Sequence, residues 1–155
     1  MSQEIERKFL VKTQPDLSQY VGQEIIQGYV TGPDDTCEVR LRKKDAQTFL
    51  TVKSQGKLVR DEYETQITVE QFEVIWPATS NQQLLKTRYQ GCLPCGTVFV
   101  LDEFKGNLAP LMLVEVEFTD VASAHNFQPP KWFGKEVTND VMYKNKSLAF
   151  AQTAP

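Results

Sequence analysis

Histidine and cysteine are scarce in this 155-residue chain, which contains one histidine and three cysteines. The odd number of cysteines does not suit a disulfide framework and agrees with a reducing compartment. A zinc site with four protein ligands needs more than Cys92, Cys95 and His125 can supply within one chain. The CLPC segment is better interpreted as a turn between two strands, because Gly91 and Gly96 flank it.

The chain also lacks long apolar runs and a strong excess of charge of either sign. No stretch approaches the roughly 20 apolar residues that cross a bilayer. The N-terminus is charged from Glu4 onward, so we expect no signal peptide and predict a cytoplasmic protein. The net charge of −3 argues against nucleic-acid or anionic-membrane partners. A length of 155 residues with 41% hydrophobic content fits a single domain over residues 1–155.

Short strand-like runs separated by turn residues occupy most of the chain. Eight strands are predicted, near residues 4–11, 24–31, 37–43, 47–53, 59–67, 84–90, 97–104 and 111–118. A capping-box spacing from Thr68 to Gln71 predicts a short helix that ends at Pro77. Two more helices are expected near residues 120–126 and 143–152, with a turn-rich segment at 128–134 between them. The sequence therefore predicts a mainly β (α+β) protein with an antiparallel sheet that helices cover on the outside.

Charged and apolar residues alternate along most of these strands. In EIERKF, the side chains of Glu4, Glu6 and Lys8 share one face of an extended chain, and the residues between them share the other. The same alternation recurs on six of the other seven strands, whereas residues 24–31 have a polar but uncharged face. The charged positions that share these faces are Glu4, Glu6, Lys8, Arg40, Arg42, Lys53, Arg60, Glu62, Glu64, Lys86, Arg88, Asp102, Glu115 and Glu117.

Two arrangements account for this alternation. The commoner one is a half-solvated sheet with apolar residues inside and charged pairs outside. Three observations favour the reverse arrangement, with charged residues inside and apolar residues outside. Like-signed neighbours on one strand repel each other, and eight antiparallel strands can close into a barrel. The predicted helices also need an apolar surface to pack against. We therefore expect an eight-stranded antiparallel closed β-barrel, a tunnel with a charged lumen. Arg7, Asp61 and Glu103 have the opposite parity and are expected outside, with Arg7 paired to a helix.

A lumen that holds many ions is expected to bind a charged ligand. Uncompensated ions away from water cost several kcal/mol each, so such a lumen cannot be dry. Clustered carboxylates suit a hard divalent cation such as Mg²⁺ or Mn²⁺, which takes oxygen ligands. Arginine and lysine side chains suit phosphate oxygens. The pattern therefore predicts acids that hold a metal and bases that hold a polyphosphate.

Several of these charged segments form an ordered set of motifs. They are EIERKFLV at the start, RLR at residues 40–42, Lys53, RDEYE at 60–64, KTR at 86–88, Asp102, EVEF at 115–118 and the closing EVTNDVMYKNKSLA. The set resembles the CYTH superfamily, the triphosphate tunnel metalloenzymes, along the whole chain. The length and the EIERKFLV form are most similar to the short bacterial branch, whose members act chiefly on inorganic triphosphate.

The resemblance implies hydrolysis of tripolyphosphate to pyrophosphate and phosphate with Mg²⁺ or Mn²⁺, without a serine, cysteine or histidine nucleophile. It implies, as metal ligands, Glu4, Glu6, Glu62, Glu64, Asp102, Glu115 and Glu117. It implies, as residues that bind the triphosphate, Lys8, Arg40, Arg42, Lys53, Arg60, Lys86 and Arg88. The expected catalytic residues are Glu4, Glu6, Lys8 and Lys86.

Two alternative functions share this pattern. A class IV adenylate cyclase, or a thiamine or nucleoside triphosphatase, would hold the triphosphate in the same way; the sequence shows no base-recognition pocket, which favours the inorganic substrate. A non-catalytic module that binds polyphosphate or nucleotide would gain nothing from many carboxylates in its lumen, which favours an enzyme. The sequence leaves a homodimer open.

Overall fold

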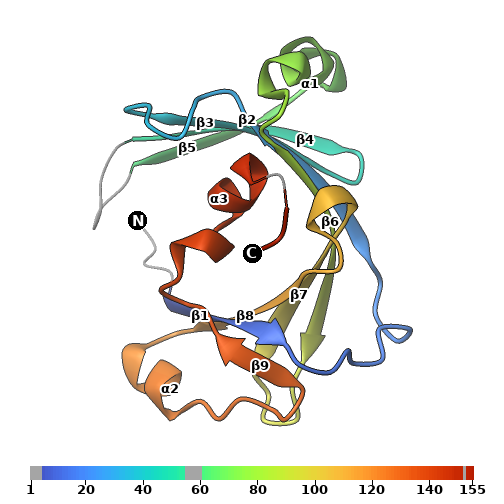
Figure 1. Ribbon diagram of the computed structural model, residues 1–155, viewed down its shortest axis with the longest axis vertical. Helices are drawn as coiled ribbons and strands as arrows, with labels where there is room; N and C mark the ends of the chain where they lie inside the picture. The colour runs from blue at the N-terminus through green and yellow to red at the C-terminus, as the bar shows by residue number, and fades with distance from the viewer. Residues whose placement is uncertain (1–4, 55–60, 152) are drawn as a thin grey trace.

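The computed structural model describes residues 5–54, 61–151 and 153–155. Its main element is a nine-stranded antiparallel sheet with the strand order β5-β4-β3-β2-β6-β7-β8-β1-β9, which curves around a concave face (Figure 1). The strands are β1 (Ile5–Val11), β2 (Gln23–Tyr29), β3 (Glu38–Lys44), β4 (Gln47–Lys53), β5 (Glu62–Ile67), β6 (Gln83–Cys92), β7 (Val98–Phe104), β8 (Met112–Phe118) and β9 (Phe133–Glu136). The helical elements are α1 (Val69–Ile75), η1 (Trp76–Thr79), η2 (Gly106–Leu108), α2 (Val121–Asn126), η3 (Val141–Tyr143) and α3 (Asn145–Phe150).

The structure contains all eight predicted strands and a ninth that the sequence did not indicate. β9 lies at the end of the segment expected to be turn-rich, and it pairs with β1 through Phe133 with Val11 and Glu136 with Phe9. The four residues of β9 include a glycine and show no alternation of apolar and polar residues. Only the pairing with β1 identifies them as a strand. In the described part of the chain β5 and β9 each pair on one side only. The prediction of eight strands is therefore corrected to nine, and closure into a barrel is not confirmed.

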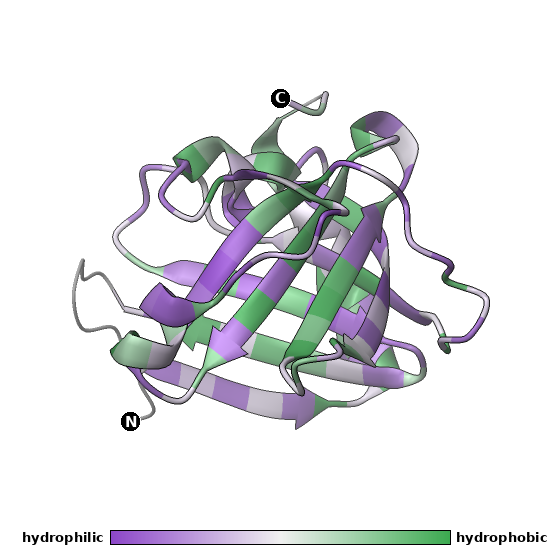
Figure 2. Ribbon diagram, turned by 90° about the horizontal axis from the view of Figure 1, so that it is seen from below, coloured by the Kyte–Doolittle hydropathy of each residue, from purple (hydrophilic) through white to green (hydrophobic). Residues whose placement is uncertain are grey.

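The convex face of the sheet carries one of two apolar clusters. Leu101, Val114 and Val116 are fully buried there, and α2 and the segment that follows it cover them (Figure 1). The buried members of the cluster are Phe9, Leu93, Phe99, Leu101, Val114, Val116, Phe127 and Phe133. Apolar and polar residues alternate along the strands, as Figure 2 shows. On this side the prediction of apolar residues beneath a helix is confirmed.

A second apolar cluster lies on the concave face and holds α3. Leu84, Phe104 and Leu113 have the same strand parity as the charged residues, and Leu148 of α3 packs with them. The prediction that residues 143–152 form an outer cover is therefore wrong, because α3 lies inside the curve of the sheet (Figure 1). The reason is that this apolar part of the concave face also has to be removed from water. The predicted helix is also divided into η3 and α3.

Helices α1 and α2 begin where the sequence predicts. Thr68 and Gln71 form the capping box of α1, with hydrogen bonds of 3.1 and 2.9 Å, and the Asp120 carboxylate caps α2 by accepting from the Ser123 N–H at 2.7 Å. The element η1 packs closely on β2 at Gly28, where a Cβ atom would lie 2.6 Å from Thr79. None of the helices in the described ranges has the length and apolar character needed to cross a bilayer.

The CLPC segment forms the turn between β6 and β7, as predicted. The Leu93 N–H donates to the Thr97 carbonyl and the Gly96 N–H donates to the Leu93 carbonyl, both at 2.8 Å. Gly96 has a φ of +90°, which favours glycine. Cys92 and Cys95 are exposed thiols at this turn.

Candidate functional site

Three ionised side chains of β6 and β7 form the most buried charged group of the concave face. The Asp102 carboxylate accepts three hydrogen bonds. Lys86 Nζ donates at 2.8 Å, Arg88 Nε at 2.7 Å and Arg88 Nη2 at 2.8 Å. Strand register explains this contact, because Arg88 lies opposite Asp102 across the two strands. Lys86 is 1% and Asp102 is 3% exposed. Both oxygens of Asp102 are therefore bound to cations.

This environment changes the acidity of both groups. Burial lowers the pKa of Lys86 to about 8; Asp102 acts to raise it and Arg88 to lower it. Burial alone would raise the pKa of Asp102, but Lys86 and Arg88 lower it overall. Lys86 Nζ also donates to Asn145 Oδ1 at 3.0 Å. Lys86 is thus a lysine that can lose its proton near pH 8 beside a carboxylate that stays ionised.

On the opposite side of the curve, Arg40 and Arg42 of β3 share one carboxylate of β5. Their guanidinium groups lie 3.6 and 3.2 Å from Glu64 Oε2, and the Thr51 hydroxyl donates to the same oxygen at 2.8 Å. Burial and the neighbouring Arg40 lower the pKa of Arg42. The Nε atoms of both arginines are buried and have no hydrogen-bond partner in the described part of the chain. The pair therefore retains donors for an acceptor that the described residues do not supply.

Carboxylates of β1 and β8 line a cavity at one edge of the concave face. Glu6 lies opposite Glu117 in the strand register, and Lys8 lies opposite Glu115. Lys8 Nζ is 3.1 Å from Glu115 Oε1. The cavity has a volume of about 560 Å³ and is lined by Glu6, Gln90, Val98, Val100, Glu115, Glu117, Phe118 and Thr119. Three carboxylates, those of Glu6, Glu115 and Glu117, therefore line one cavity.

Strand β2 separates two groups of cations. Gln27 and Tyr29, two of the residues predicted to form its uncharged polar face, are buried, and Gln27 donates to the Tyr29 hydroxyl at 3.2 Å. On one side β3 contributes Arg42, and on the other side β6 contributes Arg88. These two guanidinium groups are close enough for Arg88 to lower the pKa of Arg42. An anion that lies over β2 would meet cations from both neighbouring strands.

Most of the predicted site residues lie on this concave face. They are Glu6, Lys8, Arg40, Arg42, Lys53, Glu62, Glu64, Lys86, Arg88, Asp102, Glu115 and Glu117. Glu4 and Arg60 lie outside the described residues. Arg7 is on the convex face, as predicted: it binds Glu136 through two hydrogen bonds of 2.8 Å and donates to two carbonyls at the end of α2. Glu103 pairs with Lys105 on that face.

The carboxylates offer the oxygen donors that Mg²⁺ or Mn²⁺ takes. In the described ranges no group of three or more His, Cys, Asp or Glu residues is close enough to hold a metal by itself. Mg²⁺ commonly uses one or two carboxylates together with waters and substrate phosphates, so a larger group is not required. The Glu117 carboxylate has no hydrogen bond or ion pair within these ranges, and it faces Glu6. The oxygens of Asp102, in contrast, are already bound by Lys86 and Arg88.

Sequence reasoning missed two groups of residues at this site. Lys44 continues the inward row of Arg40 and Arg42, but the predicted strand ended at residue 43. The C-terminal segment also reaches the site: the Tyr143 carbonyl accepts from Lys8 at 3.3 Å, and Lys146 lies 3.7 Å from Glu38. The alternation of residues along β3 could have identified Lys44, whereas no local pattern indicates contacts between the C-terminal segment and the sheet.

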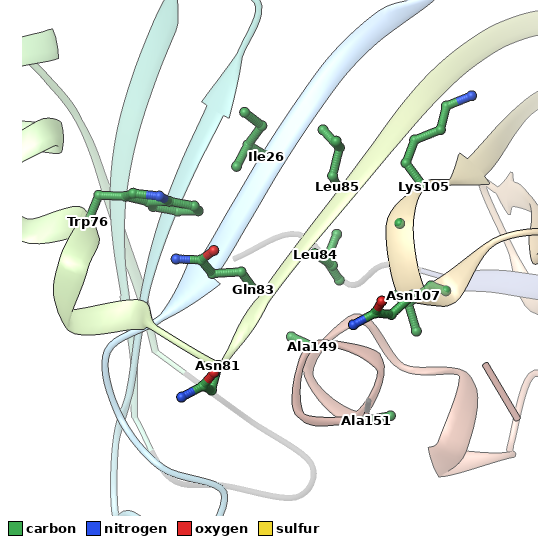
Figure 3. Close-up of a pocket in the computed structure, with 12 residues that line it drawn as sticks. Ile26, Trp76, Asn81, Gln83, Leu84, Leu85, Lys105, Asn107, Ala149 and Ala151 are labelled. Carbon is green, nitrogen blue, oxygen red and sulfur yellow. The ribbon is translucent and has the colours of Figure 1, made fainter. Parts of the chain in front are cut away.

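Another cavity, with a volume of about 480 Å³, lies apart from these charges (Figure 3). It lies where the start of β6 passes between η1 and α3, and Trp76, Gln83 and Leu84 contribute to its wall (Figure 3). Among the residues that the structure describes, none of the predicted site residues lines it, and Lys105 is the only ionised one in its wall. Its composition does not suit a polyphosphate.

Solved structures share this fold. The crystal structure of the inorganic triphosphatase NE1496 superposes with a TM-score of 0.84 at 52% sequence identity, covering 97% of each chain. A Hippeastrum protein, described as an adenylyl cyclase with a dominant triphosphatase activity, shares the fold at 17% identity with a TM-score of 0.56; 79% of this chain and 83% of that chain are covered.

Sequence comparison gives two curated relatives of nearly the same length. An inorganic triphosphatase of Nitrosomonas europaea is 55% identical over 148 residues, which cover 96% of this chain and 97% of that protein. An inorganic triphosphatase of Acetivibrio thermocellus is 34% identical over 150 residues, which cover 96% of this chain and 94% of that protein. Residues 2–147 match the CYTH domain. With the charged concave face and the ordered motifs that line it, this match assigns the chain to the CYTH domain family.

Proposed function

We propose that the protein is an inorganic triphosphatase that hydrolyses tripolyphosphate to pyrophosphate and phosphate with Mg²⁺ or Mn²⁺. The observation that carries this proposal is the concave face, where Arg42 and Arg88 face a common space over the uncharged concave side of β2 and carboxylates line the adjoining cavity. Two relatives that match nearly the whole chain are named inorganic triphosphatases, which favours the inorganic substrate over an organic triphosphate.

In this proposal the cations of the concave face bind the phosphate oxygens. The guanidinium forks of Arg40, Arg42 and Arg88 suit pairs of phosphate oxygens, and the unpartnered Nε donors of β3 support this role. The ammonium groups of Lys8 and Lys53 act as point charges, and Arg60 is expected to join them. We expect the curved sheet to enclose the substrate as a tunnel does.

The carboxylates of β1 and β8 are the proposed metal ligands. Glu6 and Glu117 face each other, Glu115 lines the same cavity, and Glu4 is expected to extend the group. Glu62 and Glu64 are proposed as further ligands from β5, directly or through water. A bound divalent cation neutralises phosphate charge and acidifies water. Asp102 is not included, because its oxygens already hold two cations in place.

Lys86 is the proposed proton acceptor. A base with a pKa of about 8 is well matched to a reaction near neutral pH. The water oxygen forms its bond to the terminal phosphorus, the phosphoanhydride P–O bond breaks, and the proton of the water passes to Lys86 Nζ. Asp102 then stabilises the ammonium group that forms, at a distance of 2.8 Å.

A substrate panel tests the activity. Purified protein with Mg²⁺ or Mn²⁺ should release phosphate from tripolyphosphate faster than from ATP or thiamine triphosphate, and it should form no cyclic AMP. Faster conversion of ATP to cyclic AMP would replace the proposal with an adenylate cyclase. Binding of tripolyphosphate without turnover under all metal conditions would indicate a non-catalytic binding module.

Glu6→Ala and Glu117→Ala test the metal ligands. Both variants should release phosphate more slowly and should need more Mn²⁺ for half-maximal activity, because each removes an oxygen donor from the cavity. Glu103→Ala is the matched control, since this carboxylate lies on the convex face and pairs with Lys105. If the Glu6 and Glu117 variants kept the metal dependence of the Glu103 variant, the assignment of ligands would be wrong.

A further inference from the structure

Lys44 lies at the end of the inward row of cations on β3. It follows Arg40 and Arg42 at intervals of two residues, so the three side chains share one face of the strand. The charged groups that act on Lys44 are Arg42, Arg88, Glu64 and Arg40, which all belong to the concave face. The ammonium group of Lys44 therefore faces the same space as the arginines of β3 and β6.

The surroundings of Lys44 are unfavourable for a cation in the protein alone. Burial and the neighbouring guanidinium groups of Arg42 and Arg88 lower its pKa. The other predicted substrate-binding cations that the structure describes each have a carboxylate partner within 4 Å, such as Glu64 for Arg42 and Asp102 for Arg88. Lys44 forms no hydrogen bond or ion pair with any residue that the structure describes.

A bound anion explains the position of Lys44 better than a contribution to fold stability does. Arg42 and Arg88 act on Lys44 more strongly than Glu64 does, and Lys44 has no ion pair with a described carboxylate, so its charge is repelled on balance and fold stability does not account for it. A polyanion bound over β2 would replace the repulsion between Lys44 and the arginines with attraction, because its oxygens would lie between the cations of β3 and those of β6. Lys44 is paired in register with Ile25 of β2, which lies opposite Lys86 of β6.

We propose that Lys44 is a further substrate-binding residue, whose ammonium group binds phosphate oxygens of the triphosphate together with Arg42 and Arg88. This inference rests on the proposed function, because it takes an inorganic triphosphate as the ligand of the concave face. It adds a cation that neither the predicted site nor the proposed ligand set includes.

Lys44→Ala is the central variant, and Lys43→Ala is its matched control. Lys43 is the adjacent residue of β3 with the same charge and the opposite parity, so its side chain is directed to the convex face. Removal of Lys44 leaves no unpaired partner behind, so we expect the variant to fold and to melt at the same or a higher temperature than the unaltered protein.

Binding of tripolyphosphate is measured in EDTA, where metal-dependent turnover cannot occur, and KM and kcat are measured with Mg²⁺. Lys44→Ala should weaken binding and raise KM about ten- to hundredfold, as expected for the loss of one charge-assisted contact. Lys44→Arg should recover most of the affinity, whereas Lys43→Ala should stay within about twofold of the unaltered protein because a surface charge contributes little.

The outcomes separate this inference from the proposed function. If the unaltered protein binds tripolyphosphate but does not hydrolyse it, the proposed function fails while the binding series still tests Lys44. If Lys44→Ala and Lys43→Ala bind tripolyphosphate with equal affinity, the role of Lys44 is refuted even when hydrolysis is intact. If the unaltered protein neither binds tripolyphosphate in EDTA nor hydrolyses it with Mg²⁺, both proposals are overturned.

Discussion

The most informative prediction concerns the proton of Lys86. With a pKa of about 8, the neutral amine makes up about a tenth of the population at pH 7 and about nine-tenths at pH 9. If Lys86 accepts the proton of the attacking water, kcat/KM should therefore rise about tenfold between these pH values and then level off, since kcat/KM reports the free enzyme. If Lys86 served only as a cation, kcat/KM should fall over the same range.

Lys86→Arg separates the charge from the proton transfer. Arginine keeps the positive charge but cannot give up its proton in a protein. The variant should bind tripolyphosphate in EDTA and should lose about 10²- to 10⁴-fold in kcat, the range of general base catalysis. Lys53→Ala is the control: it should bind substrate more weakly and retain the inflection near pH 8. Unchanged kcat in Lys86→Arg would refute the assignment of Lys86 as the base.

The same pKa shift predicts how stability depends on pH. The folded protein holds Lys86 with a pKa of about 8 against an ordinary value of 10.5, so the unfolded chain binds more protons between these pH values. The free energy of unfolding should therefore rise with pH over this window, by roughly 3 kcal/mol from this group. Urea unfolding at pH 7 and pH 10 should show this rise in the unaltered protein and a smaller one in Lys86→Met.

Two further predictions concern the fold. Arg7→Ala should lower the free energy of unfolding by about 2–3 kcal/mol, because it removes hydrogen bonds to Glu136 and to α2, whereas exposed Lys12→Ala should have little effect in the same urea titration. Gly28→Ala should lower it by about 1–3 kcal/mol, because a Cβ atom there would lie 2.6 Å from Thr79 of η1, and an unchanged melting temperature would contradict this packing.

Strand parity made the charged face predictable. Successive residues of a strand point to opposite faces whatever their partners are, so the alternation in the sequence was enough to separate Glu115 and Glu117 from Val116. The same rule placed Arg7 outside, where it binds Glu136 and the carbonyls of α2. It also applies to Lys44, which was missed because the predicted strand ended one residue too early.

Pairing between distant segments was not predictable in this way. β9 is a strand because it lies beside β1, and its own four residues carry no alternation. The position of α3 depends on Leu84 and Phe104, which share the parity of the ions and form an apolar region on the concave face. Parity tells which face a residue occupies, but it does not tell which residues of that face are neighbours.

The role of Asp102 illustrates the difference. A carboxylate on a charged face can hold a metal or neutralise a cation, and its position along the strand does not distinguish these roles. The register of β6 and β7 supports the second role that we propose, because it brings Arg88 opposite Asp102 and Lys86 within 2.8 Å of it. In this proposal the metal ligands on β1 and β8 are separate from Asp102 and Arg88, which act with burial on the pKa of Lys86. Metal affinity and the pH profile should therefore respond to different substitutions, Glu117→Ala for the first and Asp102→Asn for the second.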